Sequence, residues 1–230
     1  MEILILLAKF FPLLVLVVSF FKLNYGFALY FLYACLFPTV TMTVVPFSLL
    51  GIVFFSLSIY RFKSNISYKS VLPYLILQII ILLFIPFHDD VPFYWQVHRV
   101  QAEVFCGVFY AFSLMNIIKN ESCDIILRTM MGIMMVCCIY ALLLTTMENV
   151  NPYVMLFNLM EGKSISEEWL AADDRIFGRI SSTFYHPMKW ALFLGLSLIF
   201  TCYLYLRETK SKKIYYLLLP LLSICALLCG

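Results

Sequence analysis

The stretch IILRTMMGIMMVCCIYALLLTT, residues 125–146, decides the fold, because Arg128 is its one charged side chain. A run of about 20 apolar residues is long enough for a helix to cross the hydrocarbon core of a bilayer. This stretch therefore predicts a membrane-spanning helix.

The rest of the chain has the same character. Hydrophobic residues make up 63% of the 230 residues and charged residues 13%, whereas soluble domains are nearer half apolar and a quarter charged. Short polar interruptions divide the chain into apolar runs. We predict spans at 3–21, 23–38, 40–60, 71–87, 100–118, 125–146, 190–206 and 214–230. The predicted fold is all-α: a polytopic transmembrane helix bundle of about seven to eight spans, forming one integral membrane domain over residues 1–230.

The distribution of basic residues predicts the orientation of the chain. Lysines and arginines gather near residues 61–70, 119–128 and 207–213, which places these loops in the cytoplasm. The alternate loops, 88–99 and 147–189, are poorer in basic residues for their length. We therefore expect these two loops to be extracytoplasmic.

Two ionisable residues lie at the outer end of a predicted span. Glu103 follows Arg99 by four residues, so the two share a helix face and can pair. Ionisable side chains at this depth usually face a protein interior or a wet cavity. We expect a structural ion pair first, and the lining of a cavity second.

Metal binding has little support in the sequence. His88, Asp89 and His98 fall near one another, but they follow no recognised ligand spacing. The eight cysteines form neither a metal spacing with histidines nor a disulfide framework. The prediction is therefore no metal and no cofactor, with solvated charges and an interfacial aromatic belt at 88–99.

Polar chemistry concentrates in RIFGRISSTFYHPMKW, residues 175–190, directly before an apolar run. Arg175 and Arg179 carry guanidinium groups, which suit phosphate oxygens because the planar fork can bind two at once. Arginines at a membrane interface also often only snorkel to lipid headgroups. Pro187 is expected near the start of the following helix, where its missing N–H is harmless.

The sequence RISSTFYHPMKWALFLGL, residues 179–196, resembles the signature of the O-antigen ligase and polymerase family, bacterial integral-membrane proteins of surface-polysaccharide assembly. The family pattern is Arg-x-x-Gly-Thr-Phe-x-His/Asn-Pro-Asn, followed by a helix. Ser182 stands at the usual glycine and Met188 at the usual asparagine. The resemblance covers this motif closely and the upstream residues only by topology. The matching residues are Arg179, Thr183, Phe184, His186 and Pro187.

The resemblance implies a metal-independent membrane glycosyltransferase. Such a protein transfers glycan from an undecaprenyl diphosphate carrier at the outer face of the bacterial inner membrane. The acceptor is the next lipid-linked repeat for a polymerase, or lipid A core for a ligase. Arg179, with Arg175 second, would stabilise the departing diphosphate.

Further roles follow from the same resemblance. His186 could act as a base, although the family's tolerance of asparagine favours a role in holding the turn. Ser182, Thr183 and Pro187 would bind substrate or form that turn. The implied partners are the lipid-linked oligosaccharide, membrane lipids and other polysaccharide-assembly proteins, with no nucleic acid.

Two alternatives stay open. A transporter or flippase of lipid-linked glycans would carry charged or broken positions deep in several spans, and apart from Glu103 and Gln78 these spans are nearly clean. The other alternative is an inactive truncated membrane protein. The family runs on to a second outward loop beyond this point, so we expect the chain to be an N-terminal portion without activity alone.

Overall fold

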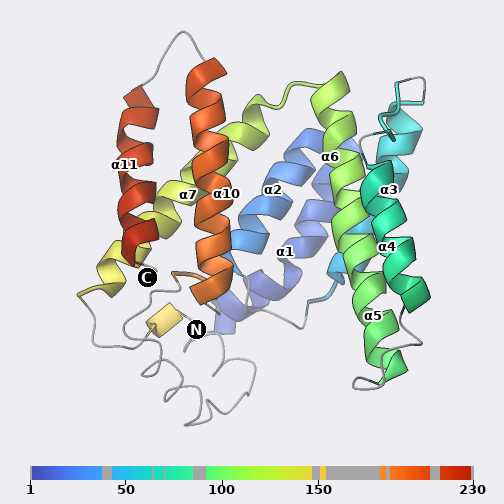
Figure 1. Cartoon of the computed structure of the whole chain (residues 1–230), viewed down its shortest axis with the longest axis horizontal. Helices are drawn as coiled ribbons and strands as arrows, with labels where there is room; N and C mark the ends of the chain where they lie inside the picture. The colour runs from blue at the N-terminus through green and yellow to red at the C-terminus, as the bar shows by residue number, and fades with distance from the viewer. Residues whose placement is uncertain are drawn as a thin grey trace. The chain divides into compact units, whose positions relative to one another are not determined.

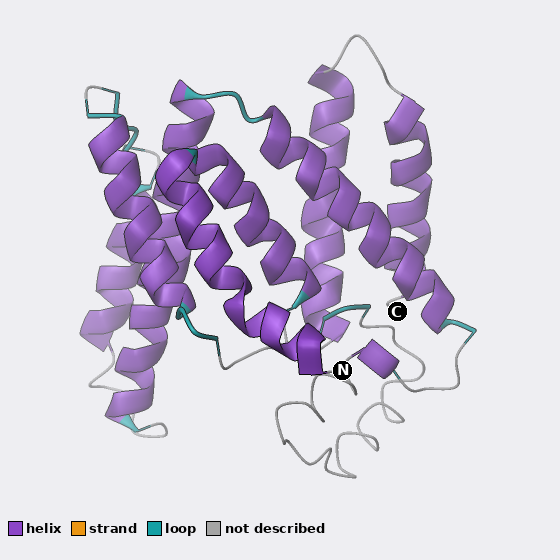
Figure 2. Cartoon of the chain, turned by 180° about the vertical axis from the view of Figure 1, so that it is seen from behind, coloured by secondary structure: helices purple, strands orange, loops and turns teal. Residues whose placement is uncertain are grey.

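The computed structural model describes residues 2–37, 43–63, 65–69, 71–84, 92–146, 151–153, 182–184, 187–207 and 213–228. Every regular element within these ranges is a helix (Figure 2). The all-helical prediction is confirmed for this part of the chain. The elements are α1 (Glu2–Phe21), α2 (Leu23–Leu36), α3 (Phe47–Arg61), α4 (Leu72–Phe84), α5 (Phe93–Glu103), the π-helical segment η2 (Val104–Val108), α6 (Phe109–Asn120), α7 (Asp124–Leu144), α10 (Pro187–Arg207) and α11 (Lys213–Leu228).

The chain divides into two compact units, and each is described by itself. The first unit comprises Met1–Ala8, Phe31–Met42 and Arg128–Gly230. The second unit comprises Lys9–Tyr30 and Thr43–Leu127.

Each predicted apolar run contains a helix, but the fifth helix begins earlier than its hydropathy indicates. It starts at Phe93, so most of the loop predicted at 88–99 is helical where it is described. Pro92 precedes it with an extended backbone (ψ 132°), and its carbonyl accepts a hydrogen bond from the Trp95 N–H at 2.9 Å. Hydropathy marks only the apolar part of a helix, whereas backbone hydrogen bonds continue through polar residues.

Two helices in the described ranges are long and apolar enough to cross a membrane. One is Phe93–Asn120, which joins α5, η2 and α6 over 28 residues, and the other is α7 with 21 residues. The apolar stretches of the other helices span only 10–17 residues each, for example Leu6–Phe21 within α1 and Trp190–Leu206 within α10. The apolar run at residues 125–146 therefore forms most of one of these two helices.

An aromatic cluster fills the core of the second unit. Tyr30 of α2 stacks on Tyr110 of α6 with ring centroids 4.1 Å apart, and Phe27 meets Phe54 edge-on at 5.2 Å. The Tyr110 hydroxyl donates to the carbonyl of Phe47 at 3.0 Å. These contacts join α2, α3 and α6.

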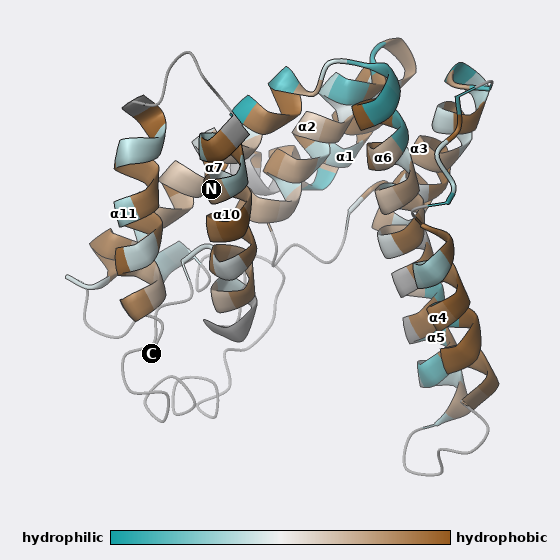
Figure 3. Cartoon of the chain, turned by 45° about the horizontal axis from the view of Figure 1, so that its top comes forward, coloured by the Kyte–Doolittle hydropathy of each residue, from teal (hydrophilic) through white to brown (hydrophobic). Residues whose placement is uncertain are grey.

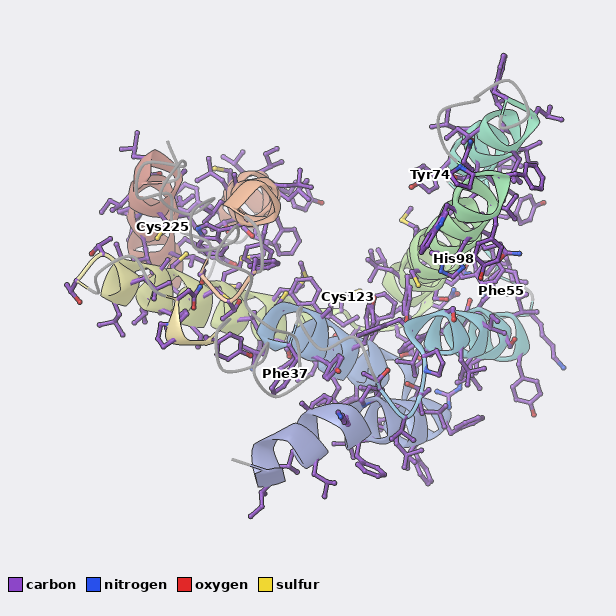
Figure 4. The ribbon with its side chains drawn as sticks, turned by 90° about the horizontal axis from the view of Figure 1, so that it is seen from below. Phe37, Phe55, Tyr74, His98, Cys123 and Cys225 are labelled. Carbon is purple, nitrogen blue, oxygen red and sulfur yellow. The ribbon has the colours of Figure 1, made fainter. Side chains whose placement is uncertain are left out.

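Helix α4 of the second unit reverses the pattern of a soluble helix. Its one strongly polar side chain, Gln78, is also its one buried residue, and all thirteen residues of α4 are described. Apolar side chains such as Ile79 and Leu83 are exposed, and Figure 3 colours α4 as hydrophobic along its length. Tyr74, labelled in Figure 4, lies 3.6 Å from the position that a Cβ on Gly107 of η2 would occupy.

Helices α10 and α11 form an antiparallel pair in the first unit (Figure 1). Near their connection, Tyr205 contacts Tyr215 edge-on at 6.2 Å between ring centroids. Cys225 of α11, labelled in Figure 4, directs its thiol toward the carbonyl of Cys138 of α7 at 3.6 Å. Helices α7, α10 and α11 therefore pack together at the position where the signature segment enters α10.

Candidate functional site

The candidate site is centred on the turn at residues 182–184, directly before α10. Ser182 has φ 52°, and among the described residues it is the non-glycine residue with a positive φ. This left-handed conformation is unfavourable for an L-residue with a Cβ and costs about 1 kcal/mol or more. The surrounding contacts must therefore hold the turn in place.

Two buried hydroxyls supply those contacts. Ser182 Oγ donates to the carbonyl of Cys137 on α7 at 2.6 Å. Thr183 Oγ1 donates to the carbonyl of Cys35 on α2 at 2.8 Å and lies 3.6 Å from Cys137 Sγ. The exposed fraction is 0% for Ser182 and 4% for Thr183. Within the first unit, the turn is thus fixed both to α7 and to the C-terminal part of α2.

The turn contacts α7 well inside the helix and not at its C-terminal end. Cys137 precedes Leu144, the last residue of α7, by seven residues, which is about 10 Å along a helix axis. The sequence indicated a polar turn at the mouth of the next helix, whereas the structure recesses it among α2, α7 and α10. The hydroxyls of Ser182 and Thr183 both donate hydrogen bonds to backbone carbonyls, and these bonds hold the turn. Contact of either hydroxyl with a substrate stays a prediction.

A second set of hydrogen bonds supports the turn from its other side. Asn151 Nδ2 donates to the carbonyl of Ser182 at 2.5 Å, and Asn151 Oδ1 accepts from the Tyr140 hydroxyl at 2.9 Å. The Tyr153 N–H donates to the Tyr140 oxygen at 3.2 Å. Burial raises the pKa of the Tyr153 phenol, so this side chain stays neutral at physiological pH.

Sequence reasoning missed Asn151 and Tyr140 as members of this site. The available signal was the pair Asn151–Pro152, because Asn-Pro marks a turn immediately after an apolar run. Nothing in the local sequence connects that turn with Ser182, which lies 31 residues later.

Three aromatic rings surround the entry to α10. Phe184 lies 5.7 Å from Trp190 and 5.0 Å from Phe193 between ring centroids, and Trp190 stacks on Phe193 at 5.5 Å. Trp190 is fully buried. The signature segment therefore ends in a closely packed aromatic cluster.

The charged residues predicted for catalysis flank this turn in the sequence. Arg175, Arg179 and His186 are outside the described residues, so their roles stay predictions. Pro187 is the first residue of α10, where its missing N–H is harmless; its side chain is not described.

The predicted pair of Arg99 and Glu103 falls on α5, four residues apart on one helix. The side chains of these two residues are not described, so their ion pair stays a prediction. On the same helix the His98 ring lies parallel to Tyr94, with centroids 6.1 Å apart (His98 is labelled in Figure 4).

No group of three potential metal ligands occurs among the described histidines, cysteines, aspartates and glutamates. His88 and Asp89 lie outside the described residues. Near them in sequence, Phe93, Tyr94 and Trp95 are exposed at the start of α5.

A buried polar cluster in the second unit has a different character. Asn116 Nδ2 donates to Ser58 Oγ at 3.0 Å, and Asn116 Oδ1 accepts from the Ser67 N–H. Asn120 Nδ2 donates to the Asn116 carbonyl at 2.9 Å. Both the nitrogen and the oxygen of the Asn116 amide are hydrogen-bonded within the protein. The role of this cluster is therefore structural: it joins α3, α6 and the loop at residues 65–69.

Comparison with known proteins gives no match to a protein-family model, to a curated protein or to a solved structure. The resemblance to the O-antigen ligase and polymerase family therefore rests on the signature motif alone.

Proposed function

We propose that the chain is a multi-pass protein of the bacterial inner membrane. Two helices of sufficient length and apolarity support membrane insertion. Helix α4 supports it further, because burying Gln78 while exposing Ile79 and Leu83 suits a helix surrounded by lipid and not by water. The seven to eight spans predicted from the sequence, and the outward position of residues 147–189, form part of this proposal.

We propose further that the protein is a surface-polysaccharide polymerase or ligase. The observation that carries this proposal is the left-handed backbone of Ser182 (φ 52°). Ser182 occupies the position at which the family signature has glycine, and glycine is the residue that adopts this conformation without a steric penalty. The backbone at residue 182 therefore has the left-handed conformation that glycine favours, although this chain has serine where the family signature has glycine.

The proposed reaction is glycan transfer from undecaprenyl diphosphate to an acceptor hydroxyl. The bond between the sugar's anomeric carbon and the phosphate oxygen breaks, and a bond from that carbon to the acceptor oxygen forms. The acceptor proton is released, and the diphosphate departs with the bonding electron pair. Arg179, assisted by Arg175, stabilises this growing negative charge, while His186 holds the turn by hydrogen bonds.

The experiment is genetic complementation with a biochemical readout. These 230 residues, and separately the whole open reading frame that encodes them, are expressed in strains that lack their own O-antigen polymerase or ligase. Restored glycan ladders on gels indicate a polymerase, and glycan attached to lipid A core indicates a ligase. Failure of both versions in both strains, with the protein present in the membrane, would contradict the proposal.

A second candidate function, transport of a lipid-linked glycan, has two specific observations in its favour. Gln78 Oε1 is buried on α4 without a hydrogen-bond partner among the described residues. The neighbouring η2 interrupts the regular helix, and π-helical segments occur frequently at functional sites. Reconstitution in vesicles distinguishes the two functions, because a flippase moves a labelled lipid-linked glycan across the bilayer without an acceptor.

A further inference from the structure

Three connections between helices meet at one end of the second unit. Side-chain hydrogen bonds join them, each running from a helix end to a backbone carbonyl that is distant in the sequence. The bonds are Arg61 Nη2 to Phe20 at 2.5 Å, Asn24 Nδ2 to Ser122 at 3.3 Å and Asn120 Nδ2 to Asn65 at 3.3 Å. The connections after α1, α3 and α6 therefore form one continuous surface.

This surface is basic. It carries five cationic side chains, and the four lysines among them are exposed: Lys22, Arg61, Lys63, Lys69 and Lys119. The acidic residues in the same connections are Glu121 and Asp124. None of the five cations forms an ion pair within the part of the chain that the structure describes. The surface therefore presents positive charge that the described protein does not neutralise.

Helix dipoles account for only part of this charge. Arg61 and Lys119 lie in the last turns of α3 and α6, where a cation is favourable. Lys69 instead lies three residues before α4, whose first turn contains no acidic residue. A cation near a helix N-terminus is unfavourable for the dipole, whereas an anion there is favourable. An external anion beside Lys69 would therefore be stabilised by both the lysine and the helix.

Exposed tyrosines lie beside the lysines. Tyr25, Tyr60 and Tyr68 are all exposed on this surface. Lys22 Nζ lies 5.2 Å from the ring centroid of Tyr25, and Lys63 Nζ lies 5.2 Å from that of Tyr60. In membrane proteins, tyrosine is enriched at the level of the lipid head groups. The positions of these rings favour an anion that belongs to a lipid head group.

We propose that this basic surface binds the head groups of anionic phospholipids in the cytoplasmic leaflet. A lysine close to an anionic membrane surface strengthens binding by about fivefold, so several lysines on one surface give a strong preference over neutral lipids. The inference rests on the membrane insertion that we propose above, and it is independent of glycan transfer.

The test removes lysine charges and leaves Arg61 in place, because its hydrogen bond to Phe20 helps to hold the surface together. In the full chain, we compare Lys63→Gln with a triple variant that has glutamine at Lys22, Lys63 and Lys119. Binding of radiolabelled phosphatidylglycerol is measured in non-ionic detergent micelles. Phosphatidylcholine and inorganic phosphate are the competitors, and thermal unfolding checks the fold.

The matched control is Lys9→Gln, which removes a lysine at the other end of α3. The Lys9 carbonyl accepts a hydrogen bond from the Val44 N–H at 3.1 Å, three residues before α3 begins at Phe47. Membrane insertion is tested separately, by extracting the wild-type chain from phosphatidylcholine vesicles with alkaline carbonate.

We expect Lys63→Gln to weaken phosphatidylglycerol binding about fivefold and the triple variant about a hundredfold. Lys9→Gln should bind like the wild type, and the unfolding temperatures should be unchanged. Equal binding by Lys63→Gln and Lys9→Gln, or equal competition by phosphatidylcholine or inorganic phosphate, would overturn the inference and leave membrane insertion intact. Release of the wild-type chain by carbonate would overturn both.

Discussion

Thr183 donates a hydrogen bond to the carbonyl of Cys35, a residue 148 positions earlier in the chain, at 2.8 Å. This bond fixes the turn before α10 to the C-terminal end of α2. Together with the bond from Ser182 to Cys137, it determines where α10 enters the first unit.

Replacing Thr183 with valine keeps the size of the side chain but removes the hydroxyl. The carbonyl of Cys35 then loses a buried partner, and we expect a loss of stability of about 1–2 kcal/mol. Thermal unfolding in detergent measures the change. Thr145→Val is the control, because the Thr145 hydroxyl bonds to Leu142 at an exposed position and its removal should have little effect. Equal unfolding temperatures for the two variants would contradict the structural role of Thr183.

Ser182 allows the backbone effect to be separated from the hydrogen bond. Both Ser182→Ala and Ser182→Gly remove the Oγ contact with Cys137, but only glycine relieves the left-handed conformation. We expect the alanine variant to be less stable than the glycine variant by about 1 kcal/mol. The free energies of unfolding in a denaturant series test this order. An alanine variant as stable as the glycine variant would argue against a positive φ at this position.

Gly26 permits close contact between α1 and α2 within the second unit. A Cβ at Gly26 would lie 2.0 Å from Ser19 Oγ and 2.8 Å from Ser19 Cα, so the helices would have to separate. We expect Gly26→Ala to destabilise the protein despite the better helix propensity of alanine. Gly132→Ala is the matched control, because no atom lies within 4 Å of its added Cβ. That variant should be neutral or more stable by up to about 1 kcal/mol.

The membrane topology can be tested with a native cysteine. Cys123 lies between α6 and α7, in the region that the basic residues place in the cytoplasm. In intact cells, a membrane-impermeant maleimide should leave Cys123 unlabelled, and permeabilisation should expose it. Tyr94→Cys provides the opposite control, because Tyr94 is 71% exposed at the predicted outer end of α5. Labelling of Cys123 in intact cells, read by mass spectrometry of the modified peptide, would reverse the predicted orientation.

Arg179 is the residue on which the proposed chemistry depends most. In whichever expressed version restores glycan transfer, Arg179→Ala should reduce that transfer a hundredfold or more, about 3 kcal/mol in the transition state, at normal protein levels in the membrane. Lysine should restore little, because it keeps the charge but not the bidentate fork. His186→Asn should retain much of the activity if the position holds the turn. Glycan transfer at the normal rate by Arg179→Ala would reduce the motif to a membrane anchor.

Local sequence determined the helical class and most helix positions. Apolar runs such as residues 125–146 predict helices and not solvent-exposed loops. Pro187 fits the first position of α10 because proline lacks the N–H that the helix interior requires. These inferences need only the composition and order of neighbouring residues. They did not predict the start of α5 at Phe93, because the polar residues around His98 lower the hydropathy without breaking the backbone hydrogen bonds of the helix.

Tertiary structure alone decided the surroundings of the candidate site. The hydroxyls of Ser182 and Thr183 become buried because their acceptors, the carbonyls of Cys137 and Cys35, come from distant parts of the chain. Main-chain acceptors exist at every residue, so no residue type in the sequence could mark these two. Packing likewise decided that Trp190 would be fully buried, because an apolar run without clear periodicity does not reveal which face of its helix meets the protein.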